Sequence, residues 1–225
     1  CTFSENVVVY NGAGMWNLST APAVTNCTFA ENVAQDAANS AGGGMFNYDS
    51  SPAIVNCTFL ENEAADGGGM YNDEGNPTVT NCILWDGDGR DLSIGGGSPT
   101  VTYCVVRGGY DAATDAANHI VSGDPLLLSP ADNGGPTETC ALREGSVAID
   151  AGTSFGAPDT DQRGESRPML KGYDIGAYEY APTPTPTMTP TPTPTLTPAP
   201  TVTPSLGPTS VPTSPTPAGP TPTAV

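Results

Sequence analysis

The sequence has very few basic residues. Its 225 residues include 6 Lys and Arg against 24 Asp and Glu, a formal net charge of −18, and the first basic residue is Arg90. Nucleic acids and anionic membrane surfaces attract positive charge, so neither is an expected partner. The chain also lacks any apolar run near the roughly 20 residues of a membrane-spanning helix. No signal peptide is recognisable, but the chain begins inside a repeat, so we expect a fragment of a longer exported protein.

Charged and aromatic residues are absent from residues 182–225, which hold 15 of the 24 prolines together with many threonines. Such a segment cannot bury enough apolar surface to offset the entropy lost on ordering. The composition therefore predicts a disordered Pro/Thr-rich linker or stalk over 182–225, largely of polyproline II character.

The rest of the chain repeats a phrase built around cysteine. The phrases APAVTNC, SPAIVNC, NPTVTNC and SPTVTYC end at four cysteines, Cys27, Cys57, Cys82 and Cys104. Counted from Cys1, successive cysteines of this series are 26, 30, 25 and 22 residues apart. Twelve residues before each of these four stands one apolar residue: Met15, Met45, Met70 or Leu92. The Met-to-Cys half is therefore constant in length, and all length variation falls between each Cys and the next Met.

A unit of this length, rich in β-branched residues, Asn and Gly, is typical of one coil of a parallel β-solenoid. Alternate strand residues face opposite sides, so Val24, Cys27 and Phe29 all face the interior only if the alternation slips at Asn26. Asn tolerates the left-handed conformation of such a corner. Stacked coils then place Asn over Asn, Cys over Cys and Phe over Phe at about 4.8 Å, with Thr28 facing solvent.

The pattern predicts an all-β fold, a single-stranded parallel β-helix over residues 1–109 followed by a C-terminal capping segment over 110–181. In the last full repeat Tyr103 replaces the corner Asn, so the ladder should be weaker there. An antiparallel sandwich would need hairpin turns about every 8 to 12 residues and gives no reason for the fixed Met-to-Cys spacing.

The cysteines have several candidate roles. A cysteine nucleophile needs a neighbouring base, but the one histidine, His119, is far along the chain. No close cysteine pair has zinc-site spacing. Side chains stacked in register do not point at each other as a disulfide requires, so we favour buried free thiols, although exported proteins usually oxidise their cysteines. Asn17, Asn26 and Asn56 begin N-glycosylation sequons, but we expect the corner amides to be used in the ladder.

Two resemblances add to this interpretation. The phrases FSEN, FAEN and FLEN at 3–6, 29–32 and 59–62, alternating with GAGM, GGGM and GGGM, resemble the repeats of polymorphic outer membrane proteins. The resemblance implies a right-handed β-helix on a bacterial surface, with adhesion as the usual role.

The second resemblance covers roughly residues 83–180. The phrases SPTVTYCVVRGGY, DPLLLSPADNGGPTETCAL, GSVAIDAG, TDQRGESRP and DIGAYEY are similar to the C-terminal part of the choice-of-anchor Q family, although Cys140 and Val147 depart from its pattern. The resemblance implies a position at the end of a secreted β-helix, before a surface-anchoring tail.

Enzymes similar to pectate lyase also use this fold, with a carboxylate cluster for calcium and a basic residue as the base. The most enzyme-like cluster here is WDGDGRDL, with Asp86, Asp88, Arg90 and Asp91, and Arg107 follows about one coil later. A polar Gly-rich turn on a solvated face explains the same residues. No catalytic or cofactor-binding residue is therefore predicted.

Calcium is the only cofactor for which the sequence offers ligands. Asp86 with Asp88, or Asp159 with Asp161, would supply hard oxygen ligands, but neither pair completes a site, so no metal ligand is predicted.

Two arginines of TDQRGESRP have a structural interpretation. We expect Arg163 and Arg167 to pair with buried acids such as Asp150 or Asp174 and so to fasten the end of the solenoid, whose open strand edges would otherwise invite aggregation.

The sequence as a whole favours a secreted or cell-surface, monomeric, non-enzymatic display or adhesion protein attached through its stalk. The variable loops, such as 34–41 and 63–66, would bind a carbohydrate or a surface protein, because loops tolerate change on a rigid scaffold. The alternative is a polysaccharide lyase or hydrolase whose catalytic coils lie upstream.

Overall fold

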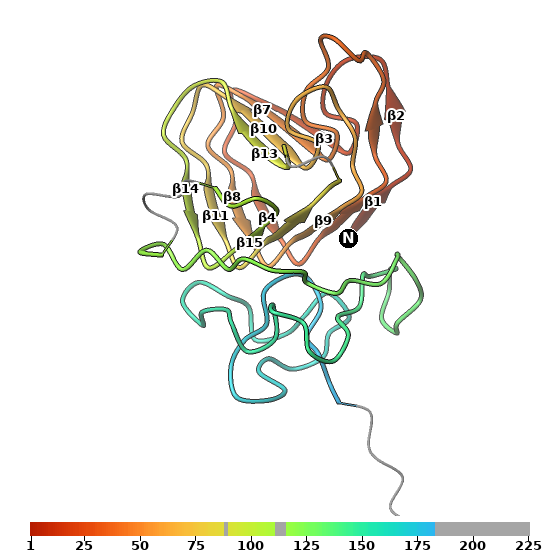
Figure 1. Ribbon diagram of the computed structural model, residues 1–225, viewed down its shortest axis with the longest axis vertical. Helices are drawn as coiled ribbons and strands as arrows, with labels where there is room; N and C mark the ends of the chain where they lie inside the picture. Colours follow the sequence, from red (N-terminus) through yellow and green to blue (C-terminus); the bar gives the residue numbers. More distant parts are fainter. Residues whose placement is uncertain (88–89, 111–115, 183–225) are drawn as a thin grey trace, which may run out of the picture. The chain divides into compact units, whose positions relative to one another are not determined.

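The computed structural model describes residues 1–87, 90–110 and 116–182. These residues form 15 β-strands and no α-helix. Every strand pairs in parallel with the equivalent strand of a neighbouring coil (Figure 1), which confirms the predicted all-β parallel β-helix. The tail predicted over 182–225 lies, beyond Pro182, outside the described residues. None of the described segments forms a helix long and apolar enough to cross a membrane.

Three sheets run along the stack of coils. The first contains β1 (Thr2–Ser4), β5 (Thr28–Ala30), β9 (Thr58–Leu60), β12 (Ile83–Trp85) and β15 (Val105–Val106). The second contains β3 (Met15–Leu18), β7 (Met45–Tyr48), β10 (Met70–Asp73) and β13 (Leu92–Ile94). The third contains β4 (Ala23–Thr25), β8 (Ala53–Val55), β11 (Thr78–Thr80) and β14 (Thr100–Thr102). A short parallel pair, β2 (Val7–Val8) and β6 (Val33–Ala34), belongs to the first two coils.

The corner between the third and the first sheet is the predicted one. Asn26, Asn56 and Asn81 have φ angles of 50°, 50° and 52°, in the left-handed region, and Tyr103 takes the same conformation at 52°. The one-residue slip brings both Val24 and Cys27 into the buried core. Asn occupies this corner because its short polar side chain lowers the cost of a left-handed backbone.

The interior is built from stacked like residues. The rings of Phe3 and Phe29 stack at 4.8 Å between centroids, and those of Phe29 and Phe59 at 4.7 Å, close to one strand spacing as predicted. Leu84 continues the column in register above Phe59. These side chains belong to one core that runs through all the coils.

A second buried column is polar and was not predicted. The amide of Asn6 donates to Asn32 at 2.8 Å, Asn32 to Asn62 at 2.8 Å, and Asn62 to a carboxylate oxygen of Asp86 at 2.6 Å. Each amide thus satisfies the next along the stack, as buried polar groups require. The closing Asn of the repeated FSEN, FAEN and FLEN phrases was the signal for this column.

Residues 124–182, here called the cover segment, have no regular strand and lie along the first sheet (Figure 1). Gln162 binds Thr2 of the first coil and Thr28 of the second. Gly176 of the same segment donates its N–H to the carbonyl of Asn81 in the fourth coil at 2.8 Å. The cover segment therefore reaches across several coils instead of closing one end.

A second apolar core joins the cover segment to the outer face of the first sheet. Ile83 and Val105 point outward from their coils and pack with Leu142, Ala148 and Ile175. Thr28 and Thr58 occupy the equivalent outward positions of earlier coils and are likewise buried. The prediction that Thr28 faces solvent was therefore wrong, because the cover segment lies over it.

The contact is close enough to need glycine. Gly176 has a φ of 101°, and a Cβ at this position would lie 2.8 Å from Ile83 Cδ1 and 2.9 Å from Thr58 Oγ1. A side chain there would have to displace Ile83 or Thr58 and would strain a backbone conformation that favours glycine.

The predicted end cap over 110–181 needs correction. Residues near the start of this range meet the last coil: Asn118 accepts a backbone hydrogen bond from Tyr103, and Val121 donates one to Cys104. Tyr110 and Ile120 pack against the end of the core. The larger part of the range is the cover segment, which shields the side of the solenoid, because the outward apolar residues of the first sheet require burial there.

The left-handed corner predicts that a Gly variant is more stable than an Ala variant, the reverse of the order expected elsewhere in a strand. At Asn56 both substitutions remove the amide, but only Gly adopts a φ of 50° without strain. We expect Asn56→Ala to be less stable than Asn56→Gly by about 1 kcal/mol, measured by urea denaturation. Val55, whose φ is not positive, is the control: there Gly should be the less stable. Equal or greater stability of Asn56→Ala would contradict the corner assignment.

Candidate functional site

The cysteines form a ladder of free thiols, as predicted. Cys27, Cys57, Cys82 and Cys104 are buried without disulfides, and each thiol donates to the carbonyl two residues earlier at 3.2 to 3.4 Å. The thiol of Cys82 also accepts the backbone N–H of Cys57 at 3.4 Å. Burial raises the pKa of the Cys82 thiol well above its ordinary value. At Cys57 burial likewise raises the thiol pKa, but hydrogen bonds with Cys27 and Cys82 outweigh it and lower the pKa below its ordinary value. Cys57 is fully buried, so a lowered pKa there does not make it an accessible nucleophile.

The sequon asparagines are all engaged. Asn17 is buried and donates to Asn47 at 2.8 Å. The corner residues form the predicted side-chain ladder at one step, where Asn81 donates to Asn56 at 3.4 Å. Otherwise they bind the cover segment: Asn26 donates to the carbonyl of Thr160, and Asn56 donates to those of Asp174 and Gly176. The continuous column of amides is formed by the FSEN-type asparagines instead.

Within the described residues, Asp86 and Asp91 of the WDGDGRDL cluster both serve the solenoid itself. Asp86 terminates the Asn column, accepting both the backbone N–H and the amide of Asn62. Asp91 is buried, and its carbonyl accepts the N–H of Met70 as part of the second sheet. Asp88 lies outside the described residues. Asp86 thus has a structural use at the end of the Asn column.

The two basic residues of this region are separated. Arg90 lies 3.9 Å from an exposed carboxylate oxygen of Asp66, in a solvated ion pair. Arg107 lies over the ring of Trp85, with its guanidinium carbon 5.5 Å from the centroid. The stack of a cation on an aromatic ring is a stabilising contact that uses the flat face of the guanidinium.

Calcium ligands are not gathered either. Both oxygens of Asp161 accept hydrogen bonds, from the N–H groups of Arg163, Glu165 and Glu179 and from the Arg163 side chain, while Asp159 is exposed. Within residues 1–87, 90–110 and 116–182, no group of three or more His, Cys, Asp or Glu side chains could hold a metal ion.

The variable loops form an ordered surface. In loop 34–41, Asp36 accepts the N–H groups of Ala38 and Asn39, and the hydroxyl of Ser40 donates to the carbonyl of Ala34 while accepting the N–H of Ala65. An open groove of about 590 Å³ lies between this loop and loop 63–66. We call it the loop groove; its lining includes Gln35, Ala37, Glu63, Ala64 and Ala65.

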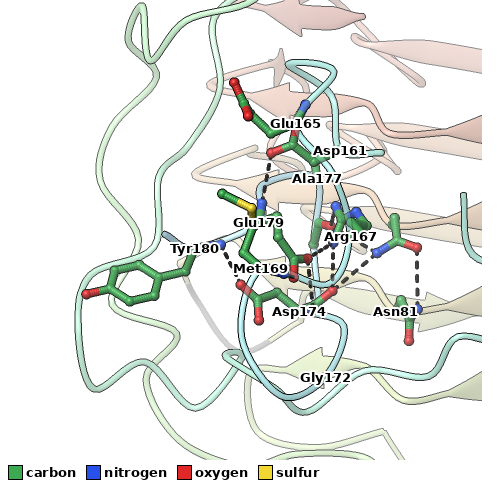
Figure 2. Close-up of polar contacts among 12 residues, drawn as sticks. Asn81, Asp161, Glu165, Arg167, Met169, Gly172, Asp174, Ala177, Glu179 and Tyr180 are labelled. Carbon is green, nitrogen blue, oxygen red and sulfur yellow. Dashed lines mark hydrogen bonds and ion pairs between the residues drawn. The ribbon is translucent and has the colours of Figure 1, made fainter. Parts of the chain in front are cut away.

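A buried ionic network holds the cover segment together (Figure 2). Arg167, whose side chain is fully buried, binds Glu179 at 2.7 Å and donates to the carbonyls of Asp174 and Gly176. Those same two carbonyls accept the amide of Asn56 from the solenoid. The network is therefore linked directly to a corner of the third coil.

The predicted arginine pairing is right in kind and wrong in partners. Arg163 pairs with Asp161 at 2.8 Å and lies over the ring of Tyr178 at 3.7 Å. The Asp150 carboxylate instead accepts the backbone N–H groups of Lys171 and Gly172. The Asp174 carboxylate accepts those of Asp150 and Tyr180. The geometry of the turns determines which carboxylates bind backbone N–H groups and which pair with an arginine, and the sequence alone does not show that geometry.

The comparisons with known proteins agree with this architecture. A family model described as a right-handed beta helix region matches residues 1–123. The chain belongs to this family, and its coils have the predicted right hand. Among curated proteins and among solved structures, none matches the chain.

The thiol ladder predicts a large difference in reactivity. Cys1 is exposed and the other five cysteines are buried, and burial raises the pKa of Cys140 to about 12. We expect one thiol to react quickly with Ellman's reagent in the native protein and all six to react in denaturant. Fewer than six in denaturant would show disulfides, and rapid reaction of several native thiols would show that the ladder is open.

Asp174 predicts a pH dependence. Burial raises its pKa to about 7, against the two backbone N–H bonds that lower it. A raised carboxyl pKa means that the folded protein retains a proton which the unfolded chain loses near pH 4, so this group lowers stability as the pH rises from 4 to 7. Arg167 and Glu179 are its charged neighbours.

We expect Asp174→Asn to flatten the decline, so that the difference in unfolding free energy from wild type changes by on the order of 1 kcal/mol between pH 4 and 7. Urea denaturation at several pH values measures it. Asp159→Asn, in the same segment, is the control for loss of one negative charge. Parallel curves for wild type and Asp174→Asn would refute the assignment.

Proposed function

We propose that this right-handed β-helix is a non-catalytic scaffold for adhesion or display at a cell surface. Its loops 34–41 and 63–66 would contact a carbohydrate or a surface protein, and the Pro/Thr-rich segment would serve as a stalk. The observation that carries the proposal is the loop groove: it is formed by the half of the repeat whose length varies, above a core whose register does not.

The side-chain environment of the candidate acids and bases supports a binding role. Asp86 is used in the Asn column, Asp161 in the Arg163 pair, and Arg107 in the stack on Trp85. Among the described residues, Glu63 is the one ionisable residue that lines the loop groove. A lining without a basic residue suits recognition better than general acid–base catalysis.

The resemblance to polymorphic outer membrane protein repeats and to the choice-of-anchor Q family supports the surface location. The Asn of FAEN and FLEN forms the buried column from which loops 34–41 and 63–66 depart. The high negative charge keeps such a surface soluble and disfavours nonspecific binding to nucleic acid.

Filling the loop groove tests this function. Ala37 is exposed and lines the groove, whereas Ala38 is exposed beside it and does not. On an array of glycans and immobilised extracellular proteins, we expect Ala37→Trp to weaken binding of at least one ligand at least tenfold. Ala38→Trp is the matched control and should bind as wild type does.

The same panel tests the enzymatic alternative. Acidic and neutral polysaccharides should remain uncleaved with and without calcium. Calcium-dependent cleavage that is lost in Arg107→Ala would overturn the proposal, and so would absence of binding to every glycan and protein on the array.

A further inference from the structure

A second groove, of about 560 Å³, lies on the third sheet, away from the variable loops. Its floor is formed by the outward side chains of β11 and β14, namely Thr78, Thr80, Thr100 and Thr102. The loop 153–156 of the cover segment forms one wall. We call it the threonine groove.

The floor is a regular array of hydroxyl groups. Thr78 pairs in register with Thr100, and Thr80 with Thr102, so the rows lie about 4.8 Å apart. The hydroxyl oxygens of Thr80 and Thr102 are 3.2 Å apart. The fold does not demand threonine here, because the first residue of this pair is Ala23 and Ala53 in the two earlier coils.

The wall presents an aromatic ring to solvent. Phe155 is 87% exposed, more than any other large hydrophobic residue among those described. Its loop is nonetheless held firmly: the Asn81 amide donates to the Thr153 carbonyl at 2.7 Å and accepts the Thr153 N–H at 2.9 Å, and the Thr153 hydroxyl accepts the N–H of Phe155 at 3.1 Å. An exposed ring on an anchored loop is preorganised for contact with a ligand.

The repeat changes its corner residue at this groove. Tyr103 lines the groove and stacks on His119 at 4.4 Å. Its φ of 52° is unfavourable for a tyrosine, whereas the three earlier corners use Asn. A residue that is strained in the left-handed conformation, at a position where Asn would be tolerated better, points to a functional requirement for Tyr103.

The lining formed by the described residues is uncharged, although the whole chain has a net charge of −18. It combines two aromatic rings, threonine methyl groups and an array of hydroxyls that both donate and accept hydrogen bonds. A pyranose ring has the matching surface, with apolar C–H faces and hydroxyls around its edge. The volume is within the range of roughly 300–1,000 Å³ typical of small-ligand sites.

We propose that the threonine groove binds a neutral carbohydrate. Phe155 and Tyr103 contact the apolar faces of the sugar rings, and the hydroxyls of Thr80 and Thr102 exchange hydrogen bonds with the sugar hydroxyls. This site is separate from the loop groove and does not depend on the function proposed for it.

Calorimetric titration of the full chain tests the proposal. The probes are soluble tetrasaccharides of glucose, xylose, mannose and galactose, with a tetrasaccharide of galacturonic acid as the charged comparison. We expect at least one neutral probe to bind with a Kd below 1 mM and the charged probe to bind at least tenfold more weakly.

Two substitutions and their matched controls locate the binding. Phe155→Ala removes the exposed ring and Thr80→Val removes one hydroxyl with little change of shape; each should weaken binding at least fivefold. Leu170→Ala, also exposed in the cover segment, and Thr25→Val, on the same sheet outside the groove, should bind within twofold of wild type. Urea denaturation verifies that the folds are equally stable.

Several outcomes would overturn the proposal: no neutral probe binds at 1 mM, the galacturonate probe binds as tightly, or Phe155→Ala binds as wild type does. Ala37→Trp separates the two sites. Its failure to disturb tetrasaccharide binding is expected, whereas a tenfold loss would place the sugar in the loop groove instead.

Discussion

The in-register stacking of parallel coils is the constraint on which the rest of this structure depends. Each strand pairs residue for residue with its equivalents, so Met45 lies on Met70 and Phe29 on Phe59. One inserted residue in the Met-to-Cys half would turn every following inward side chain outward. Added length is therefore confined to the Cys-to-Met half, where it forms loops instead of disrupting the core.

The same register makes the outer surface of the solenoid repetitive, and the cover segment uses that repetition. Because each corner is left-handed, the amides of Asn26, Asn56 and Asn81 all face outward and bind backbone groups of the cover segment. Arg167 shares two acceptor carbonyls with Asn56, so the ionic network and the solenoid stabilise each other. The described residues consequently belong to one compact unit.

Departures from the repeat mark the places where the chain does something other than stack. Asp86 ends the Asn column. Ile83 replaces an outward threonine and packs in the second core. Tyr103 replaces a corner Asn beside the threonine groove. A fold that hosts both enzymes and binding proteins does not choose between them. The choice rests on these departures and on the variable loops.

What the sequence determined by itself is everything that depends on contacts between equivalent residues of neighbouring coils: the parallel β-helix, the corner at Asn56, the free thiols and the stacked Phe rings. These contacts recur at the repeat period, so one sequence displays them several times. The partners of Arg167, the burial of Thr28 and the position of the cover segment were decided only by the tertiary structure. The reason is physical: the contact from Asn56 to Gly176 joins residues 120 positions apart, and it occurs once, through backbone carbonyls that every residue carries.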